Sequence, residues 1–241
     1  MTIYAPNIVK NGIVACWDAA GKRSYPGTGT TWYDMSGNEN NGTLENGPTF
    51  SSANGGSIVL DGSDDYVTIA NSTSLEIAGQ ITISLFVNFS SLPSNAAVGI
   101  MDKGGGGVDN GGFYLILDDR DSTSSTNAVG FEIGDTSDNR LNKFANNAFP
   151  ATETWRHVAA TYNDTGEDMA IYIDGVAQSL TTRSDSGSPT LILSTLVLAV
   201  GALNDGSLPM SGSISNVLIY NRALTADEIR QNYNAAKGRF K

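Results

Sequence analysis

Cysteine and histidine each occur once in the 241 residues of this sequence. The single cysteine, Cys16, excludes an internal disulfide and a thiolate metal cluster. The single histidine, His157, excludes a zinc site built on two or three imidazoles. Cys16 lies in an apolar run, which predicts a buried small side chain. His157 alternates with apolar neighbours and lacks the Gly-x-Ser-x-Gly context of a serine nucleophile, which predicts a packed or hydrogen-bonded strand residue.

Positive charge and long apolar runs are also scarce. The 14 Lys and Arg residues are outnumbered by 25 Asp and Glu residues, which leaves a net charge of −11. A protein with this negative net charge repels polyanions, so nucleic acid is not an expected partner. The longest apolar stretch, 196–202, is far shorter than the roughly 20 residues that span a membrane, so no membrane partner is expected. The N-terminus lacks the basic and apolar regions of a signal peptide, so we expect synthesis in the cytoplasm.

Glycine is plentiful, with 27 residues, alongside many serines, threonines and asparagines. Together with 40% hydrophobic and 16% charged residues, this composition is typical of a globular chain of short strands and tight turns. Apolar and alternating runs predict about a dozen strands. They lie at 13–17, 57–60, 66–69, 81–89, 98–101, 113–117, 129–133, 155–162, 169–173, 176–178, 191–193, 196–200 and 214–220.

Three local patterns refine this prediction. Residues 81–89 alternate between an apolar and a mostly polar face, which predicts a strand in the outer layer of a sandwich. Asp174-Gly175 predicts a two-residue hairpin with a type I′ turn, because both residues tolerate positive φ. The glycine run 104–107 predicts a mobile hairpin tip, because it lacks the Gly-Lys-Ser/Thr ending of a phosphate loop.

One helix is indicated, at about 225–237. Thr225 and Glu228 have the spacing of a capping box. Ile229 and Tyr233 lie four residues apart and are expected to face the sandwich, and Gly238 is expected to end the helix. The chain is therefore predicted to be all-β, an antiparallel β-sandwich with one short C-terminal helix. We expect a single domain at 12–241, preceded by an N-terminal arm at 1–11.

Three segments resemble one known family. They are Leu-Asp-Gly-Ser-Asp-Asp-Tyr-Val at 60–67, Ile-Tyr-Ile-Asp-Gly at 171–175 and Ser-Gly-Ser-Ile-Ser-Asn-Val-Leu-Ile-Tyr-Asn-Arg-Ala-Leu at 211–224. Together they resemble the motifs of laminin-G-like, concanavalin A-like jelly-roll domains. Segments 12–20 and 24–38 are similar to laminin-G-like modules of phage virion proteins. Lectins, adhesion modules, glycosidases and structural domains all have this sandwich fold. The resemblance is therefore specific for the fold and only weakly specific for the function.

Catalysis is not expected. In laminarinase-type glycoside hydrolases, which the resemblance includes, one strand carries the pattern Glu-x-Asp-x-x-Glu and points its carboxylates into one cleft. This sequence does not contain that pattern. The nearest carboxylate pairs are Glu132 with Asp135 and Glu167 with Asp168. Both pairs lie near predicted strand ends or turns, which favours solvated loops. We predict no catalytic residue and no enzyme.

Calcium is the cofactor that the resemblance suggests. Many relatives hold a structural calcium with an acid of the closing strand, but Ser215-Asn216 stands at that place here. Asn216, through its carbonyl oxygen, and Asp18 are the candidate ligands, with reduced affinity because one charge is lost. Asn204 and Asp205, and the turn at Asp64-Asp65, are rim-loop candidates. The alternative is that these acidic turns only cap strands.

Sugar recognition needs an exposed aromatic platform with polar side chains beside it. Trp32, next to Tyr33 in a Gly- and Thr-rich loop and near Tyr25, is the candidate platform. Packing in the core or at a seam is the alternative for Trp32. Trp17 and Trp155 are predicted to be core residues.

Two functions remain open at this point. The first is a non-enzymatic virion structural or decoration protein, made in the host cytoplasm, that docks on phage capsid or tail proteins or on sister subunits in a homo-oligomer. The alternative is a carbohydrate-binding adhesion module for host-surface glycans, assisted by calcium, on the virion or at a bacterial surface.

Overall fold

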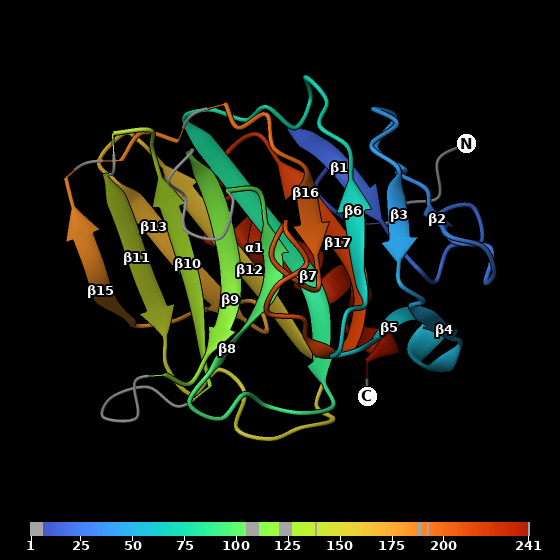
Figure 1. The fold of residues 1–241 in the computed structure, drawn as a ribbon. Coiled ribbons are helices and arrows are strands. Elements are labelled where there is room, and N and C mark those ends of the chain that lie inside the picture. Colours follow the sequence, from blue (N-terminus) through green and yellow to red (C-terminus); the bar gives the residue numbers. More distant parts are fainter. Residues whose placement is uncertain are drawn as a thin grey trace.

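A computed structural model describes residues 7–104, 111–120, 127–137, 139–187, 189–191 and 193–240. Two antiparallel sheets pack face to face, with a short helix, α1 (Ala226–Ala236), at the end of the chain (Figure 1). The predicted all-β sandwich with a C-terminal helix is confirmed. Most of the predicted glycine-rich hairpin tip, 105–107, lies outside the described residues. No described helix is long and apolar enough to cross a membrane.

The first sheet places β7 and β17 at its centre. Its order is β14 (Val176–Ala177), β13 (Asp168–Ile173), β12 (Arg156–Asn163), β7 (Gln80–Phe89), β17 (Ser211–Tyr220), β5 (Ser57–Asp61) and β4 (Thr49–Ser51). A further strand, β1 (Ile13–Trp17), also pairs with β17, and η1 (Ala53–Gly55) is a short 3-10 turn between β4 and β5.

The second sheet faces the viewer in Figure 1. Its order is β15 (Leu180–Ser186), β11 (Arg140–Ala145), β10 (Ala128–Gly134), β9 (Gly112–Asp118), β8 (Ala97–Asp102), β16 (Leu198–Val200), β6 (Tyr66–Ile69), β3 (Gly42–Glu45) and β2 (Thr31–Trp32). The core lies between the sheets and contains alternate residues of each central strand, such as Phe113 and Leu115 of β9 and Phe131 of β10.

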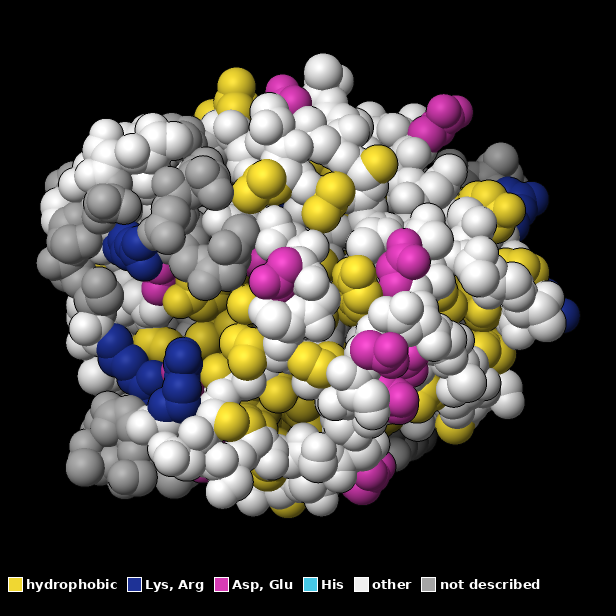
Figure 2. Space-filling model, viewed as in Figure 1, with side chains coloured by type: hydrophobic (Ala, Val, Ile, Leu, Met, Phe, Trp, Pro, Cys, Tyr) yellow, Lys and Arg dark blue, Asp and Glu magenta, His cyan; other side chains and the backbone are white. Residues whose placement is uncertain are grey.

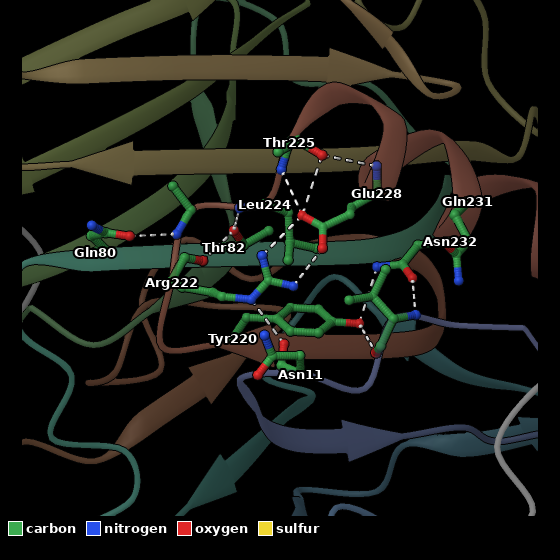
Figure 3. Close-up of polar contacts among 12 residues, drawn as sticks. Asn11, Gln80, Thr82, Tyr220, Arg222, Leu224, Thr225, Glu228, Gln231 and Asn232 are labelled. Atoms are coloured by element: carbon green, nitrogen blue, oxygen red, sulfur yellow. Dashed lines mark hydrogen bonds and ion pairs between the residues drawn. The ribbon is translucent and has the colours of Figure 1, made fainter.

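Strand β7 differs from its prediction in one respect. Its apolar face lies in the core as expected, but its polar face is buried as well, including Thr82 and Ser84. The segment that leads into α1 covers this face, because the Thr82 hydroxyl donates to the Arg222 carbonyl and accepts from the Leu224 amide (Figure 3). The strand is therefore central and covered on both sides, and its polar residues bond to the covering segment.

The predicted capping box at the start of α1 is confirmed. The Thr225 hydroxyl accepts from the Glu228 amide, and the Glu228 carboxylate accepts from the Thr225 amide (Figure 3). Arg222 donates to both oxygens of the same carboxylate, at 2.9 and 2.6 Å. Ile229 faces the sandwich and is buried, and Lys237, not Gly238, caps the helix before a 3-10 turn, η2 (Lys237–Arg239).

Residues 7–11 of the predicted arm pack against the domain. The Val9 amide donates to Asn232, and the Val9 carbonyl accepts from the Tyr220 hydroxyl (Figure 3). Ile8 and Val9 are buried in a small apolar cluster with Ile229. This part of the segment is therefore a layer over β17 and α1 and not a free arm. Residues 1–6 lie outside the described part of the chain.

The Asp174-Gly175 turn joins β13 to β14 as predicted. Both residues have positive φ, 52° and 77°. The Asp174 carboxylate also accepts from the His157 amide and from Arg156, so it anchors the turn to the neighbouring strand.

Candidate ligand-binding site

The tryptophans do not form the predicted platform. Trp32 is only 1% exposed and packs in the main core with Trp17, so its ring offers no face to a sugar. Tyr33 is 45% exposed. Trp155, which we predicted to be a core residue, is half-buried and packs against the Phe240 ring at 4.7 Å between centroids.

An arginine holds the carboxylate at the predicted calcium position. Asp18 and Asn216 do lie together, but both carboxylate oxygens of Asp18 accept from Arg239, each at 2.9 Å. Arg239 also donates to the Ser215 hydroxyl. Asn216 directs its amide nitrogen, not its carbonyl oxygen, to Asp18 at 3.4 Å. The guanidinium thus supplies a positive charge at the place where the resemblance suggests a calcium ion.

The rim-loop candidates Asn204 and Asp205 have hydrogen-bond partners within the domain. Asp205 accepts from the amide and the hydroxyl of Ser207, and the Asn204 amide donates to Asp102. Asp61, Asp64 and Asp65 bring carboxylate oxygens within 4.8 Å of one another.

The single cysteine and the single histidine of the chain are both buried. Cys16 is buried, and burial raises the pKa of its thiol. His157 is buried beside Ser84, whose hydroxyl lies 2.9 Å from its Nε2, and burial lowers the pKa of His157 to about 3. His157 therefore stays neutral throughout the physiological range, as a packed strand residue.

A group of polar side chains that the sequence analysis did not bring together lies on the outer face of the second sheet. Because side chains alternate along a strand, the residues between the core positions of β9, β10 and β11 point away from the core. These outward residues are Tyr114, Ile116 and Asp118 on β9, Gly130 and Glu132 on β10, and Asn142 and Phe144 on β11.

Glu132 is the centre of this group. We had predicted a solvated loop here, and this prediction is wrong: Glu132 lies within β10 and is only 4% exposed. One carboxylate oxygen, Oε2, accepts from the Tyr114 hydroxyl at 2.6 Å and from the Asn142 amide nitrogen. The other oxygen, Oε1, is buried without a hydrogen-bond partner and forms a long ion pair with Arg140 Nη1, at 4.0 Å. Burial raises the pKa of Glu132, and burial together with the Glu132 charge raises that of Tyr114.

Asn142 carries a second unsatisfied acceptor. It is 7% exposed, and its carbonyl oxygen is buried with no hydrogen-bond partner. A buried polar atom without a partner costs about 1–3 kcal/mol, and in native structures such atoms are few. Two of them, on residues hydrogen-bonded to each other, form a pair of acceptors suited to a ligand that donates hydrogen bonds.

Next to this pair, an aromatic ring and two arginines are packed together. The Phe144 ring lies so close to Gly130 that a Cβ at this position would come within 2.3 Å of it. The guanidinium of Arg183 stacks 3.7 Å above the ring. Arg183 and Arg120 both donate to Asp118, at 2.8 Å. Burial acts to raise the pKa of Asp118, but the hydrogen bonds from Arg120 outweigh it and the pKa lies below its usual value.

The segment at 201–210 crosses the outer face of the second sheet at β8, beside this group of polar side chains. Gly99 allows this segment to cross the sheet, since a Cβ there would come within 2.5 Å of the Ala202 backbone. Leu203 packs with Ile116, and Leu208 is 38% exposed. Tyr114, Ile116, Arg120, Leu203 and Leu208 enclose a recess of about 60 Å³.

Figure 2 shows this face of the molecule. Basic side chains gather over its β9 to β15 part, and hydrophobic side chains lie exposed in the hollow beside them. Most of the rest of the visible surface is polar, with separate acidic groups. This combination of exposed apolar surface with a few fixed polar groups is typical of a ligand-binding site.

The fold is an antiparallel two-sheet jelly-roll sandwich, and the sequence places it in a family. The concanavalin A-like lectin/glucanases superfamily matches residues 61–230, which is more than half of the chain. The chain belongs to this superfamily, as its motifs indicated. No curated protein matches it in sequence.

Solved structures show the same fold at low identity. Domain 4 of an extracellular arabinanase from Geobacillus stearothermophilus, in complex with arabinotriose, has a TM-score of 0.63 and 17% identity, covering 93% of this chain and 98% of that one. The binding domain of Paraclostridial Mosquitocidal Protein 1 has a TM-score of 0.68 and 17% identity, covering 94% and 52%.

The ligand-binding domain of Botulinum neurotoxin serotype D, in complex with N-acetylneuraminic acid, has a TM-score of 0.69 and 14% identity, covering 94% and 51%. The chain thus spans about half the length of the two toxin domains. At these identities the likeness establishes the fold alone.

Proposed function

We propose that this protein is a carbohydrate-binding module whose ligand lies on the outer face of β9, β10 and β11. The observation that carries the proposal is the pair of buried acceptors on Glu132 and Asn142 that receive no hydrogen bond, with only a long ion pair from Arg140 to Glu132 beside them. Sugar hydroxyl groups are donors that such acceptors bind, and the tyrosine hydroxyl beside them helps to fix their orientation. The arabinotriose complex of a domain with the same fold supports this choice.

We further propose that the module binds without turnover. Glycosidases place two carboxyl groups about 5–9.5 Å apart across the bond that they cleave. On this face Glu132 pairs with Tyr114, and Asp118 lies four residues further along β9. At about 3.4 Å per residue, the two backbones are about 14 Å apart. The Asp118 carboxylate is also held by two arginines.

Isothermal titration calorimetry tests the binding function. We would titrate the protein with arabinotriose, cellotriose, maltotriose and triacetylchitotriose. The decisive variant is Glu132→Gln, which keeps the shape but replaces the free acceptor with an N–H donor. We expect at least one of these ligands to bind with a millimolar or lower Kd, and Glu132→Gln to weaken that binding more than tenfold.

The matched control is Glu39→Gln, an exposed glutamate far from this face in sequence, which should leave the Kd unchanged. Absence of binding by all four ligands, or equal binding by the wild type and Glu132→Gln, would contradict the proposal. Because the face does not include the aspartate cluster at 61–65, EDTA should not change the Kd, whereas the calcium-assisted alternative predicts that it does.

The virion role stays a prediction that rests on the resemblance of the N-terminal segments. Its partners would be phage capsid or tail proteins, and a carbohydrate-binding module on a virion is compatible with it. Mass spectrometry of purified particles, with cross-linking to identify the neighbouring protein, would test it.

A further inference from the structure

The recess beside Tyr114 indicates what kind of sugar the site takes. Its volume is about 60 Å³, whereas pockets that hold a whole small molecule measure about 300–1,000 Å³. A pyranose ring therefore does not fit in it, but a substituent of a few heavy atoms does. The recess is a place for one group that projects from a ligand lying on the face.

The walls of the recess select the chemistry of that group. Ile116, Leu203 and Leu208 are apolar, and the Tyr114 ring forms a further wall. A methyl group is the smallest group that gains by burial there, at about 0.8 kcal/mol per buried carbon. The remaining lining residue, Arg120, has a half-exposed side chain. Its Nε and Nη2 atoms donate to Asp118, and the remaining N–H groups favour a ligand group that carries an acceptor oxygen close to the methyl.

Leu208 is a second sign that the recess is built for contact with a ligand. It has a φ of 52°, in the left-handed region that leucine seldom adopts. Two hydrogen bonds hold this conformation, from the Gly99 amide to the Leu208 carbonyl and from the Leu203 amide to the Ser207 carbonyl, both at 2.8 Å. Strained residues of this kind cluster at ligand-binding loops. The result is a leucine side chain that stays exposed at the edge of the recess.

The free acceptors adjoin the recess. Glu132 pairs directly with Tyr114 across β10 and β9, and Ile116 lies two residues from Tyr114 on the same face. Neighbouring strands are about 4.8 Å apart, and residues two apart along a strand are about 7 Å apart. A group in the recess and a hydroxyl group at Glu132 are thus separated by about the width of one sugar ring.

We propose that the ligand of this face is a sugar that carries an acetamido group. Its methyl lies in the recess, its carbonyl oxygen accepts from Arg120, and ring hydroxyl groups donate to Glu132 and Asn142. An acetamido group combines a methyl and an acceptor oxygen within three heavy atoms, which a hydroxyl group or a bare methyl group does not. This inference rests on the proposed carbohydrate-binding function and adds the class of sugar.

A comparison of matched disaccharides tests the inference. Diacetylchitobiose and cellobiose differ only in the acetamido groups, and the monosaccharide methyl α-fucoside offers a methyl group without a carbonyl oxygen beside it. We expect the protein to bind diacetylchitobiose at least tenfold more tightly than cellobiose in a calorimetric or NMR titration. Leu208→Ala, which removes an exposed wall of the recess, should reduce this ratio to threefold or less. Leu193→Ala, at another exposed leucine, is the control and should leave the ratio unchanged.

The outcomes separate this inference from the function on which it rests. Equal binding of the two disaccharides, tighter binding of the fucoside, or an unchanged ratio in Leu208→Ala would overturn the acetamido assignment and leave carbohydrate binding intact. If Leu208→Ala is poorly folded, Leu208→Gly replaces it, because glycine accepts the positive φ without strain. Failure of every sugar, including the four trisaccharides above, to bind would overturn both.

Discussion

Replacing Glu132 with glutamine should stabilise the protein while weakening ligand binding. One oxygen of the buried carboxylate accepts no hydrogen bond and has a long ion pair with Arg140, at 4.0 Å, and burial raises the pKa of the group. In glutamine, the carbonyl oxygen can keep the bonds from Tyr114 and Asn142, and no charge is buried. An acid whose pKa is higher in the folded than in the unfolded state destabilises the fold once the pH exceeds the unfolded value. The gain from Glu132→Gln should therefore be present at pH 7, shrink as the pH falls through the raised pKa of the folded protein, and be lost by about pH 4.5.

The size of the gain follows from the buried group. Leaving a buried polar atom unsatisfied costs about 1–3 kcal/mol, and glutamine retains part of that cost through its own N–H. We expect the free energy of unfolding to rise by about 1 kcal/mol at pH 7, which for a domain of this size raises the Tm by about 2–4 °C. Urea denaturation at pH 7 and pH 4, with Glu39→Gln as control, measures the difference. A Glu132→Gln protein that is less stable at pH 7, or a difference that grows at pH 4, would refute the reasoning.

Three further predictions concern stability. Gly130→Ala should lower the free energy of unfolding by about 1–3 kcal/mol, because its Cβ would press on the Phe144 ring; urea denaturation measures this loss. Arg239→Ala should lower it by about 1–3 kcal/mol, because it leaves the Asp18 carboxylate without its main donor; the Tm measured by circular dichroism should fall accordingly. The pKa of Glu228 is lowered to about 2 by its arginine partner, so the stability lost in Glu228→Gln, about 1 kcal/mol at pH 7, should vanish as the pH falls from about 4.5 towards 2.

Two of these changes have a control in the same chain. Gly238→Ala adds a Cβ in open space and should change the free energy of unfolding by less than about 0.5 kcal/mol. Arg230→Ala breaks an exposed ion pair with Asp227 and should cost little. A loss in Gly238→Ala equal to that in Gly130→Ala, or in Arg230→Ala equal to that in Arg239→Ala, would contradict the corresponding explanation. If the loss of stability in Glu228→Gln persisted at pH 2, the explanation by the lowered pKa of Glu228 would be contradicted.

The sequence predicted the fold wherever the pattern is local. Turn chemistry located Asp174-Gly175, the capping spacing located α1, and apolar alternation located the central strands, because each of these signals depends on neighbouring residues. The strands that were missed lie at or next to the edges of the sheets. β2, β3 and β4 are too short to show a period, and β11 and β15 carry polar residues such as Asn142 and Arg183 on a face that is partly buried.

The candidate site was missed because no local pattern in the sequence reveals it. Its residues come from separate strands, and only the register between β9 and β10 brings Tyr114 beside Glu132. A usable signal did exist. Once 113–117 and 129–133 are taken as strands, the outward positions read Tyr114, Ile116, Gly130 and Glu132, and the small residue marks a place where a ring can lie flat. The partner of Asp18 at the candidate calcium position could not be predicted either, because Arg239, more than 200 positions away, reaches the carboxylate only in the folded chain.

Both described ends of the chain pack on the first sheet, on the side away from the candidate site. Residues 7–11 bond to Tyr220, Arg222 and α1, and Phe240 stacks on Phe86 of β7. A tether attached at either end would thus hold the molecule by its back and leave the outer face of the second sheet turned towards the solution. The protein can therefore be immobilised on a sensor chip, or displayed in many copies on a bead, without blocking the surface that we expect to contact glycans.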